Sequence, residues 1–286
     1  MDISFDVFGR TSTPTHTQIC QDVFRDLAFR GYLEEGQIDS LYCSSCQRFL
    51  ADRYVEGECP YCFSDGARGD QCDSCGKIYD STLLKNPRCS LCDSPVDRKK
   101  RKHIFFNLSK LQPKLEAWFK TWNQASPLVR GITQSWLSSP GSLGKMCISR
   151  DLRWGVPLPK TPFFPDDEYK NKVMYVWFDA PLGYLSILAS SRNDWNEEWL
   201  SSEKTQWIAF MGKDNVSFHT LTFPAMLMAT GHPYILPSTI SATHYLMYCG
   251  QKFSKSRNVG IFGDMLERLP IPIDFWRYYL LRIRPE

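Results

Sequence analysis

Two lysines near the end of the chain lie in a segment whose composition suits an anion. The segment "GQKFSKSRNVG" runs from Gly250 to Gly260 and contains Lys252, Ser254 and Lys255. Glycine and serine keep a backbone mobile, and lysine ammonium groups are donors that proteins use to hold phosphate. The segment therefore predicts a mobile phosphate-binding loop. The other residues of such a site have to come from elsewhere in the chain.

Eight of the 11 cysteines form four Cys-x-x-Cys pairs. Each pair places two thiolates on one tight turn, and two such pairs complete a tetrahedral zinc site. A disulfide framework is the alternative, but it is typical of small secreted chains, and nothing in this sequence indicates secretion. The sequence therefore predicts two structural zinc ions without a catalytic role. Spacing alone allows a sequential arrangement, in which the first and second pairs hold one ion and the third and fourth pairs hold the other. The predicted ligands are Cys43, Cys46, Cys59, Cys62, Cys72, Cys75, Cys89 and Cys92.

The composition is that of an ordinary globular protein. The 286 residues suffice for one large or two medium domains, with 43% hydrophobic and 23% charged residues. The net charge of +3 is too small to indicate a broad nucleic-acid footprint. No stretch reaches the ~18 apolar residues of a membrane span, and the N-terminus lacks the apolar region of a signal peptide. These features predict a soluble, cytoplasmic protein without membrane contact.

The second half of the chain has the pattern of an α/β fold. Two segments, "KVMYVWFDAPLGYLSIL" and "TQWIAFMGKDNVSFHTLTFPAMLMATG", each read as strand, turn and helix, and "STISATHYL" adds a third strand. This order predicts a parallel sheet, in which ligands bind beyond the carboxyl ends of the strands. The first strand would end at Asp179, Ala180 and Pro181, and the second at Gly212, Lys213 and Asp214. The lysine loop follows the third strand, so all three clusters would share one edge.

The first half contains a helix, the cysteine region and a run of basic residues. Thr13 is a predicted N-cap, with Pro14 in the first turn and Gly31 at the end of the helix. The basic run "DRKKRKHIFF", residues 97–106, is most simply a solvated loop, with an RNA-facing or localisation role as the alternative. The segments "SKLQPKLEAWFKTW" and "ITQSWL" predict two amphipathic helices.

Each candidate residue has an ordinary structural explanation when it is taken alone. Trp177 and Tyr184 could be core aromatics, and His219 a structural histidine. Lys213 and Asp214 could form a surface ion pair worth ~0–1 kcal/mol. Their shared placement at strand ends, together with a lysine loop, favours a site over these single explanations.

The motifs also carry a resemblance to a known family. The segments "FGRTSTP", "FLADRYVEGECPYC", "ARGDQCDSCGK", "ISRDLRWGVPLP", "YVWFDAPLGYLS", "FMGKDNVSFHT" and "KFSKS" follow one another as in methionyl-tRNA synthetases of the eukaryotic cytosolic type. The chain resembles that family over nearly its whole length. The resemblance implies a class I synthetase with a Rossmann-like nucleotide-binding fold and an inserted zinc-bearing domain. It further implies activation of methionine by ATP with Mg²⁺ and transfer to tRNA. A larger synthetase assembly is a candidate partner, and the sequence leaves membership of it open.

The resemblance also assigns roles to individual residues. It implies a methionine pocket whose aromatic walls suit a polarisable thioether: Trp177, Ala180, Pro181, Tyr184, Phe218 and His219. It implies ATP contacts at Gly212 and Asp214 on the ribose side and at Lys252, Ser254 and Lys255 on the phosphates, with Arg150 at the reaction centre. It favours nested zinc sites, in which Cys59, Cys62, Cys72 and Cys75 hold one ion and the outer four cysteines the other.

The resemblance divides the chain into four parts. Residues 1–30 would end the first half of the nucleotide-binding fold, and residues 31–148 would form the connective insertion with two zinc knuckles. Residues 149–243 would form the second half of that fold, and residues 244–286 the lysine loop and the start of a stem-contact region.

One family signature is absent from this sequence. Class I synthetases carry His-x-Gly-His, but none of His16, His103, His219, His232 and His244 is two or three residues from another. We therefore expect an incomplete catalytic region, without the His-x-Gly-His part and the anticodon-binding domain. The alternative is a non-catalytic, zinc-containing fragment or paralogue that binds RNA or a protein partner.

Overall fold

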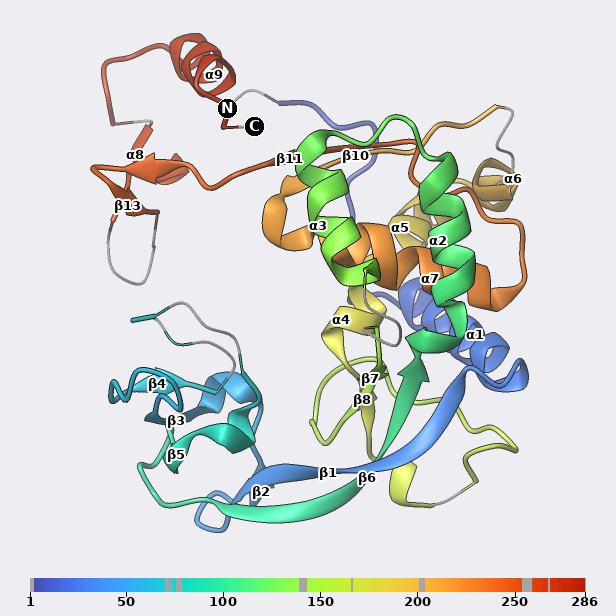
Figure 1. Cartoon of the computed structure of the whole chain (residues 1–286), viewed down its shortest axis with the longest axis vertical. Helices are drawn as coiled ribbons and strands as arrows, with labels where there is room; N and C mark the ends of the chain where they lie inside the picture. The colour runs from blue at the N-terminus through green and yellow to red at the C-terminus, as the bar shows by residue number, and fades with distance from the viewer. Residues whose placement is uncertain are drawn as a thin grey trace. The chain divides into compact units, whose positions relative to one another are not determined.

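The computed structural model describes residues 3–69, 72, 74–75, 79–138, 143–165, 167–200, 204–253, 259–266 and 268–285 (Figure 1). The chain forms two compact units, each built from segments that are far apart in the sequence. Unit 1 comprises residues 1–19, 108–144 and 181–286, and unit 2 comprises residues 20–107 and 145–180.

The largest sheet of unit 2 is antiparallel, with strand order β2-β1-β6-β7. Its centre is a ribbon of β1 (Leu33–Cys43) and β6 (Asp97–Asn107), paired from Leu33↔Phe106 to Tyr42↔Asp97. The short strands β2 (Arg48–Phe49) and β7 (Lys145–Cys147) lie at its edges. The prediction of a loop at residues 97–106 is therefore wrong. The basic residues are compatible with a strand because β1 satisfies their backbone groups while their side chains extend into solvent.

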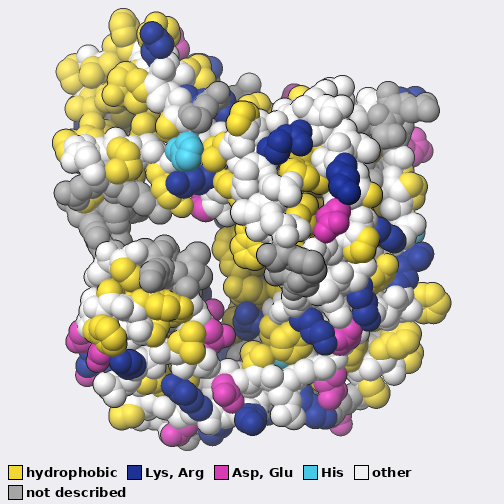
Figure 2. Space-filling view, viewed as in Figure 1, with side chains coloured by type: hydrophobic (Ala, Val, Ile, Leu, Met, Phe, Trp, Pro, Cys, Tyr) yellow, Lys and Arg dark blue, Asp and Glu magenta, His cyan; other side chains and the backbone are white. Residues whose placement is uncertain are grey.

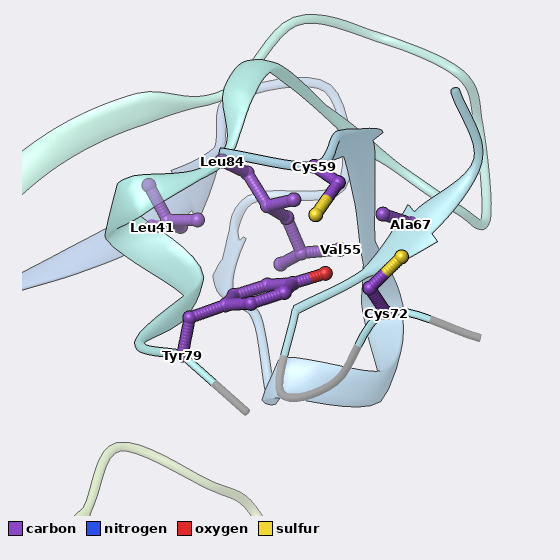
Figure 3. Close-up of a cluster of buried hydrophobic side chains, with 7 residues drawn as sticks. All are labelled: Leu41, Val55, Cys59, Ala67, Cys72, Tyr79 and Leu84. Atoms are coloured by element: carbon purple, nitrogen blue, oxygen red, sulfur yellow. The ribbon is translucent and has the colours of Figure 1, made fainter. Parts of the chain in front are cut away.

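The cysteine region forms a second small sheet with strand order β4-β3-β5. It consists of β3 (Val55–Glu58), β4 (Ala67–Arg68) and β5 (Lys85–Cys89), with the short helices η1 (Asp52–Tyr54) and η2 (Ser81–Leu83). Figure 3 shows its small core, in which two cysteines pack with apolar side chains. The members are Leu41, Val55, Cys59, Ala67, Cys72, Tyr79 and Leu84. So few apolar groups predict that this module depends on its metal sites.

The segment around "WFDAP" is helical, which corrects the predicted strand. The strand β9 covers only Val173–Met174 and pairs antiparallel with β8 (Ser149–Arg150). The chain then enters α4 (Val176–Asp179), η5 (Ala180–Leu182) and α5 (Gly183–Ser191). Asp179, Ala180 and Pro181 therefore do not end a parallel strand. A continuous apolar run fits a buried helix as well as a buried strand, and here the helical alternative applies.

Unit 1 contains the parallel pair of strands among the described residues. The strand β10 (Ile208–Gly212) pairs with β11 (Thr239–Thr243), from Ile208↔Thr239 to Gly212↔Thr243. Between them run η6 (Lys213–Asn215), η7 (Phe218–Thr222) and α7 (Phe223–Thr230), which ends at Gly231 with φ +75°. Two of the three predicted parallel strands are thus present, and the larger parallel sheet stays a prediction.

Helices pack around this pair. The helix α2 (Gln112–Thr121), which follows η3 (Leu108–Leu111), contacts α7, and α3 (Pro127–Leu137) contacts β11. The indole nitrogen of Trp122 donates to the carbonyl oxygen of Ser238 over 2.7 Å and joins the end of α2 to the start of β11. The two amphipathic helices predicted between residues 109 and 137 are therefore confirmed.

The remaining elements lie near the ends of the chain. The helix α1 (Pro14–Phe29) begins as predicted, because the backbone nitrogen of His16 donates to Oγ1 of Thr13 over 3.1 Å. The hairpin of β12 (Met247–Tyr248) and β13 (Gln251–Lys252) precedes α8 (Gly263–Leu266) and α9 (Ile273–Arg282), and α6 (Trp195–Leu200) precedes β10. Among the described residues, no helix has the length and apolar character that crossing a membrane requires.

Candidate active site and metal sites

The eight paired cysteines of unit 2 form two clusters of four sulfur atoms. One consists of Cys43, Cys46, Cys89 and Cys92, and the other of Cys59, Cys62, Cys72 and Cys75, with the ligand atoms of each within 4.8 Å of one another. The structure thus brings together the sets of the nested arrangement and not those of the sequential one. The residues after three of the pairs, Gln47, Phe63 and Asp93, have φ between +50° and +61°. This left-handed residue closes each turn and directs both thiols to the same side.

The spacing of the sulfur atoms fits a tetrahedral ion. In the first cluster, the Sγ atom of Cys46 lies 3.4 Å from that of Cys92 and 3.9 Å from that of Cys89. In the second cluster, the Sγ atoms of Cys62 and Cys72 lie 3.6 Å apart. Four sulfurs at about 2.3 Å from a central zinc lie about 3.8 Å from one another, whereas a disulfide holds them at about 2.05 Å. Both clusters could therefore hold zinc, and neither has the geometry of disulfides.

Serine side chains support the charged form of some of these thiols. Hydrogen bonding with Ser64 lowers the pKa of Cys72 to about 6, and Ser94 does the same for Cys92. The hydrogen bond with Cys92 raises the pKa of Cys46 to about 12. The thiols therefore share protons unequally, and a divalent cation would displace the protons that remain.

In unit 1, one predicted cluster, Gly212, Lys213 and Asp214, lies at the carboxyl ends of β10 and β11. Gly212 pairs with Thr243, and the ammonium group of Lys213 lies 4.9 Å from the ring centre of Tyr245. A Cβ at Gly212 would lie 2.7 Å from the Oδ1 atom of Asp214, so the carboxylate folds back over the glycine. A side chain at position 212 would displace this carboxylate, which is exposed at the end of the strand.

Tyr184 and His219 form a hydrogen-bonded pair in unit 1. The Tyr184 hydroxyl lies 2.9 Å from Nε2 of His219, and Nδ1 lies 2.9 Å from the carbonyl oxygen of Asn215. Because a carbonyl only accepts, Nδ1 carries the proton and Nε2 accepts from the hydroxyl. Burial lowers the pKa of His219 and raises that of Tyr184, so both groups are neutral at pH 7. His219 belongs to η7, a π-helical turn of a kind that often occurs at functional sites.

The environment of Tyr184 differs from that of a core aromatic. Its ring stacks on Phe223 and contacts Trp207, yet 43% of the residue is exposed. It also lines a cavity of about 380 Å³ together with Ile187, Trp199 and other residues. An aromatic side chain that is held on one face and exposed on the other is typical of a binding wall.

The lysine loop lies partly outside the described residues. Ser254 and Lys255 are not described, and of Lys252 only the backbone is, in β13. The described residues before and after the loop contact each other. Gly260, which follows the loop, has φ +124°, and a Cβ there would lie 2.3 Å from the ring of Phe253, which precedes it. That ring contacts Tyr248 and Phe262 edge-on, so an apolar contact closes the base of the loop.

Arg150 in unit 2 is held in place by its neighbours. Its guanidinium lies 3.8 Å from the ring centre of Tyr175, and Nη1 donates to the carbonyl oxygens of Cys147 and Ser149 over 3.2 and 2.8 Å. An aromatic face and two backbone acceptors therefore fix the orientation of this guanidinium, whereas the side chain of an ordinary surface arginine is free to move.

The residues assigned to methionine divide between the two units. Trp177 and Ala180 lie in unit 2, whereas Pro181, Tyr184, Phe218 and His219 lie in unit 1. Within unit 2, α4 buries Phe178 against Phe106 and leaves 42% of Trp177 exposed. The exposure of Trp177, like that of Tyr184, argues against a purely structural role in the core.

Sequence comparison decides the family. A family model described as "tRNA synthetases class I (M)" matches residues 1–286. The chain belongs to this class I synthetase family. It is 47% identical over its whole length to the probable cytoplasmic methionine–tRNA ligase of Dictyostelium discoideum and covers 38% of that protein. It is also 47% identical to the human cytoplasmic methionine–tRNA ligase, of which it covers 31%. The chain therefore spans about a third of the length of these relatives.

Solved structures of synthetases share the fold. Methionyl-tRNA synthetase of Mycobacterium tuberculosis in complex with methionyl-adenylate matches 98% of this chain and 48% of its own, with a TM-score of 0.65 and 27% identity. A second structure of that enzyme, bound by the same adenylate, matches with a TM-score of 0.64 and 24% identity. The α/β class I synthetase fold inferred from the motifs is thus confirmed.

This synthetase chain also contains a buried charge network that its sequence did not indicate. Asp151 accepts from Lys172 over 2.6 Å and lies 3.1 Å from Nε2 of His103, and both partners are about 1% exposed. Burial opposes ionisation of Asp151, but His103 and Lys172 outweigh it and hold its pKa below the usual range. On the other side of the ring, Nδ1 of His103 lies 2.8 Å from Oγ of Ser149.

This network borders Arg150 in the sequence and anchors β8. Ser149 and Asp151 face the network, and Arg150 between them points the other way because successive side chains of a strand alternate. The network escaped prediction because its members come from three distant segments and lysine is rarely buried. The sequence does not show that Asp151 and Lys172 meet in the fold.

Proposed function

We propose that the chain forms part of the catalytic region of a cytoplasmic methionine–tRNA ligase. In this reaction a carboxylate oxygen of methionine attacks the α-phosphorus of ATP, pyrophosphate leaves, and the methionyl group then passes from the adenylate to tRNA. The observation that carries the proposal is the exposed Tyr184 held by a neutral His219. The names of the relatives that match the whole chain support it.

The methionine side chain would bind an aromatic wall with a neutral polar end. We assign this wall to Trp177, Ala180, Pro181, Tyr184, Phe218 and His219. Aromatic rings contact a thioether favourably, at ~0.3–1.5 kcal/mol for each contact. A neutral imidazole suits an uncharged sulfur because a charged ring would lose solvation without gaining a partner. The lowered pKa of His219 keeps the ring in that state.

ATP would bind at the carboxyl ends of β10 and β11. Asp214 would accept from the ribose hydroxyls where Gly212 leaves room for its carboxylate. Lys252, Ser254 and Lys255 would contact the phosphates, which Mg²⁺ accompanies in solution. Arg150 would stabilise charge at the reaction centre. Fixed cations aimed at developing negative charge lower a barrier more than mobile ones do, because they need no reorganisation.

Two zinc ions would hold the module around β3, β4 and β5, with no position open to substrate. We place the end of the first half of the nucleotide-binding fold at residues 1–30, the zinc-bearing insertion at residues 31–148 and the second half of that fold at residues 149–243. Residues 244–286 would carry the lysine loop and the start of a stem-contact region. A larger synthetase assembly would be a further partner.

A chimera tests the proposal. Residues 1–286 would replace the matching 292 residues of the Dictyostelium relative, and amino-acid-dependent exchange of pyrophosphate into ATP would be measured. The expected result is exchange with methionine and little with leucine, and a loss of methionine use in a His219→Ala variant. A folded chimera with two zinc ions and no methionine-dependent exchange would contradict the proposal.

A further inference from the structure

A cysteine of the edge strand β7 lies outside both metal clusters and has no part in the proposed reaction. Cys147 is partly exposed, and it pairs with Phe105 across β6 and β7. The backbone nitrogen of Ile148 donates to the carbonyl oxygen of Ile104 over 2.8 Å and extends this register toward His103. Because side chains of a strand alternate, His103 lies diagonally opposite Cys147 on the same face. The thiol therefore has an imidazole as its cross-strand neighbour.

Three cations share one carboxylate beside this imidazole. Arg101, His103 and Lys172 lie 3.3, 3.1 and 2.6 Å from the carboxylate of Asp151. Lysine side chains normally lie in solvent, as basic side chains do in Figure 2 where Figure 1 draws β1 and β6, but that of Lys172 is fully buried. Burial opposes the charged form of His103, but Asp151 and Cys147 outweigh it and raise its pKa. With His103 charged, this cluster favours a second anion.

The thiolate of Cys147 can supply that anion. Burial opposes ionisation of Cys147, but the hydrogen bond with His103 and the positive charge of Arg150 outweigh it and lower its pKa. The protonated thiol donates to the carbonyl oxygen of Ser149 over 3.6 Å, which is a weak bond because a thiol is a weak donor. Ionisation therefore forfeits little and gains two cationic partners.

The other two cysteines outside the metal clusters have different environments. Cys20 is fully buried, and burial raises its pKa, with the nearby Asp179 adding to the rise. Cys249 is exposed, so exposure alone would make it the more reactive thiol. The thiolate and not the thiol is the nucleophile, and thiolates form beside cationic groups. Its cationic partners therefore distinguish Cys147 from both.

We propose that Cys147, held in a cluster with His103 and Asp151, is a reactive thiolate and a site of oxidation by hydroperoxides. Its sulfur attacks one oxygen of hydrogen peroxide, and a sulfur–oxygen bond forms as the oxygen–oxygen bond breaks. Hydroxide leaves and takes a proton from solvent. The thiolate is thus oxidised by two electrons to a sulfenic acid, and the peroxide is reduced to water. The inference goes beyond the proposed function, because this step needs neither methionine, ATP nor tRNA.

The pH dependence of alkylation tests the thiolate in the zinc-replete chain of 286 residues. Iodoacetamide would be the probe, and peptide mass spectrometry would give a rate for each cysteine. The reference thiol N-acetylcysteine is mostly protonated at about pH 6, so its rate should rise roughly 50- to 100-fold up to about pH 8. The rate at Cys147 should rise less than about tenfold over the same range. A rise parallel to that of the reference would overturn the proposal, and the comparison does not depend on how accessible the sulfur is.

Trapping of the sulfenic acid tests the oxidation step. Dimedone would be present while the chain reacts with an equimolar amount of hydrogen peroxide at about pH 6. The dimedone adduct should form at Cys147 at least about fivefold faster than at Cys249, and a Cys147→Ser variant should lose it. Formation of the adduct at Cys249 before Cys147 would contradict the proposal, because exposure would then decide reactivity.

Two histidine variants test the role of the cluster. His103→Gln removes the imidazolium and should give Cys147 the steep pH profile of the reference thiol. His232→Gln, at an exposed histidine, is the matched control and should keep the shallow profile. A shallow profile in folded His103→Gln would show that the cluster does not activate the thiol. Zinc content and circular dichroism would establish folding, and the profile of the unaltered chain decides the proposal even if His103→Gln does not fold.

Discussion

The hydroxyl of Tyr184 donates to Nε2 of His219 over 2.9 Å, and Nδ1 of the same ring donates to the carbonyl oxygen of Asn215 over 2.9 Å. The two bonds select one neutral tautomer of His219 and hold the hydroxyl of Tyr184, although 43% of that residue is exposed. The wall that we assign to methionine therefore owes its position in part to the backbone carbonyl of Asn215, three residues beyond the end of β10 at Gly212.

Removing this hydroxyl should affect methionine more than ATP. In the chimera, Tyr184→Phe keeps the ring but leaves Nε2 of a buried His219 without its donor, which costs ~1–3 kcal/mol. We expect the KM for methionine to rise about 5- to 100-fold and the KM for ATP to change little. Steady-state exchange kinetics would measure both, with Tyr278→Phe on exposed α9 as the control. Equal changes in the two KM values would mean that Tyr184 is structural.

Asp179 should make stability depend on pH. Burial raises its pKa to about 7, from an ordinary value of 3.8. The folded state therefore holds a proton that the unfolded state releases, so this contribution to stability is complete below about pH 4 and is lost as the pH rises to 7. Asp179→Asn should be progressively more stable than the unaltered chain between pH 5 and 7, with a constant difference above that range. Urea unfolding at several pH values would measure it, and a difference independent of pH would contradict the raised pKa.

The buried ion pair of Lys172 and Asp151 should show strong coupling. Lys172→Met leaves a buried carboxylate without its shortest partner and should cost ~3–5 kcal/mol, whereas Lys170→Met on the exposed neighbour should cost little. The double variant with Asp151→Leu should lose clearly less than the sum of the two single losses, because neither charge is then left unpaired. Chemical unfolding would give the three values, and additive losses would show that the pair is not coupled.

The cysteine clusters should bind two zinc ions for each chain. Cys46→Ser and Cys62→Ser should each weaken one site, whereas Cys249→Ser, at an exposed cysteine outside the clusters, should leave both intact. Chelation should expose the backbone amides of residues 43–92 to hydrogen exchange and affect β10 and β11 much less, because metal binding provides the folding energy of a module with so small a core. Elemental analysis that found one zinc or none in metal-replete, reduced protein would contradict this prediction.

Local chemistry was the part of the site that the sequence predicted best. Cysteine pairs such as Cys59 and Cys62 mark their own turns, because ligand type and spacing lie within four residues. The partner of each pair lies up to 49 residues away, as between Cys43 and Cys92, so spacing left it open and only the family resemblance favoured the nested sets. The helix signals at Thr13 and Gly31 were also local, and the structure confirms both, because α1 begins after Thr13 and Gly31, with φ +72°, follows its last residue, Phe29, by two positions.

Two predictions that depended on tertiary context were wrong, although the parallel pair of β10 and β11 was predicted correctly. The run from Val173 to Leu188 is apolar whether it forms a strand or a helix, and it forms a two-residue strand followed by helices. Residues 97–106 look like a loop by charge, yet ten cross-strand partners in β1 make them a strand. The buried network at Asp151 required knowledge of which distant segments meet, and that information is carried by the fold as a whole.

The rate of methionyl-adenylate formation in the chimera, with and without Lys255→Ala, tests the central claim most directly. If the chain supplies the lysine loop of a methionine–tRNA ligase, the unaltered chimera should form adenylate from methionine and ATP in a rapid single turnover. Lys255→Ala should then lower that rate by about 10²–10³ and change methionine affinity little, because the ammonium group acts where negative charge develops on the phosphates. A variant rate within about threefold of the unaltered rate would contradict the account, as would a folded chimera that forms no adenylate.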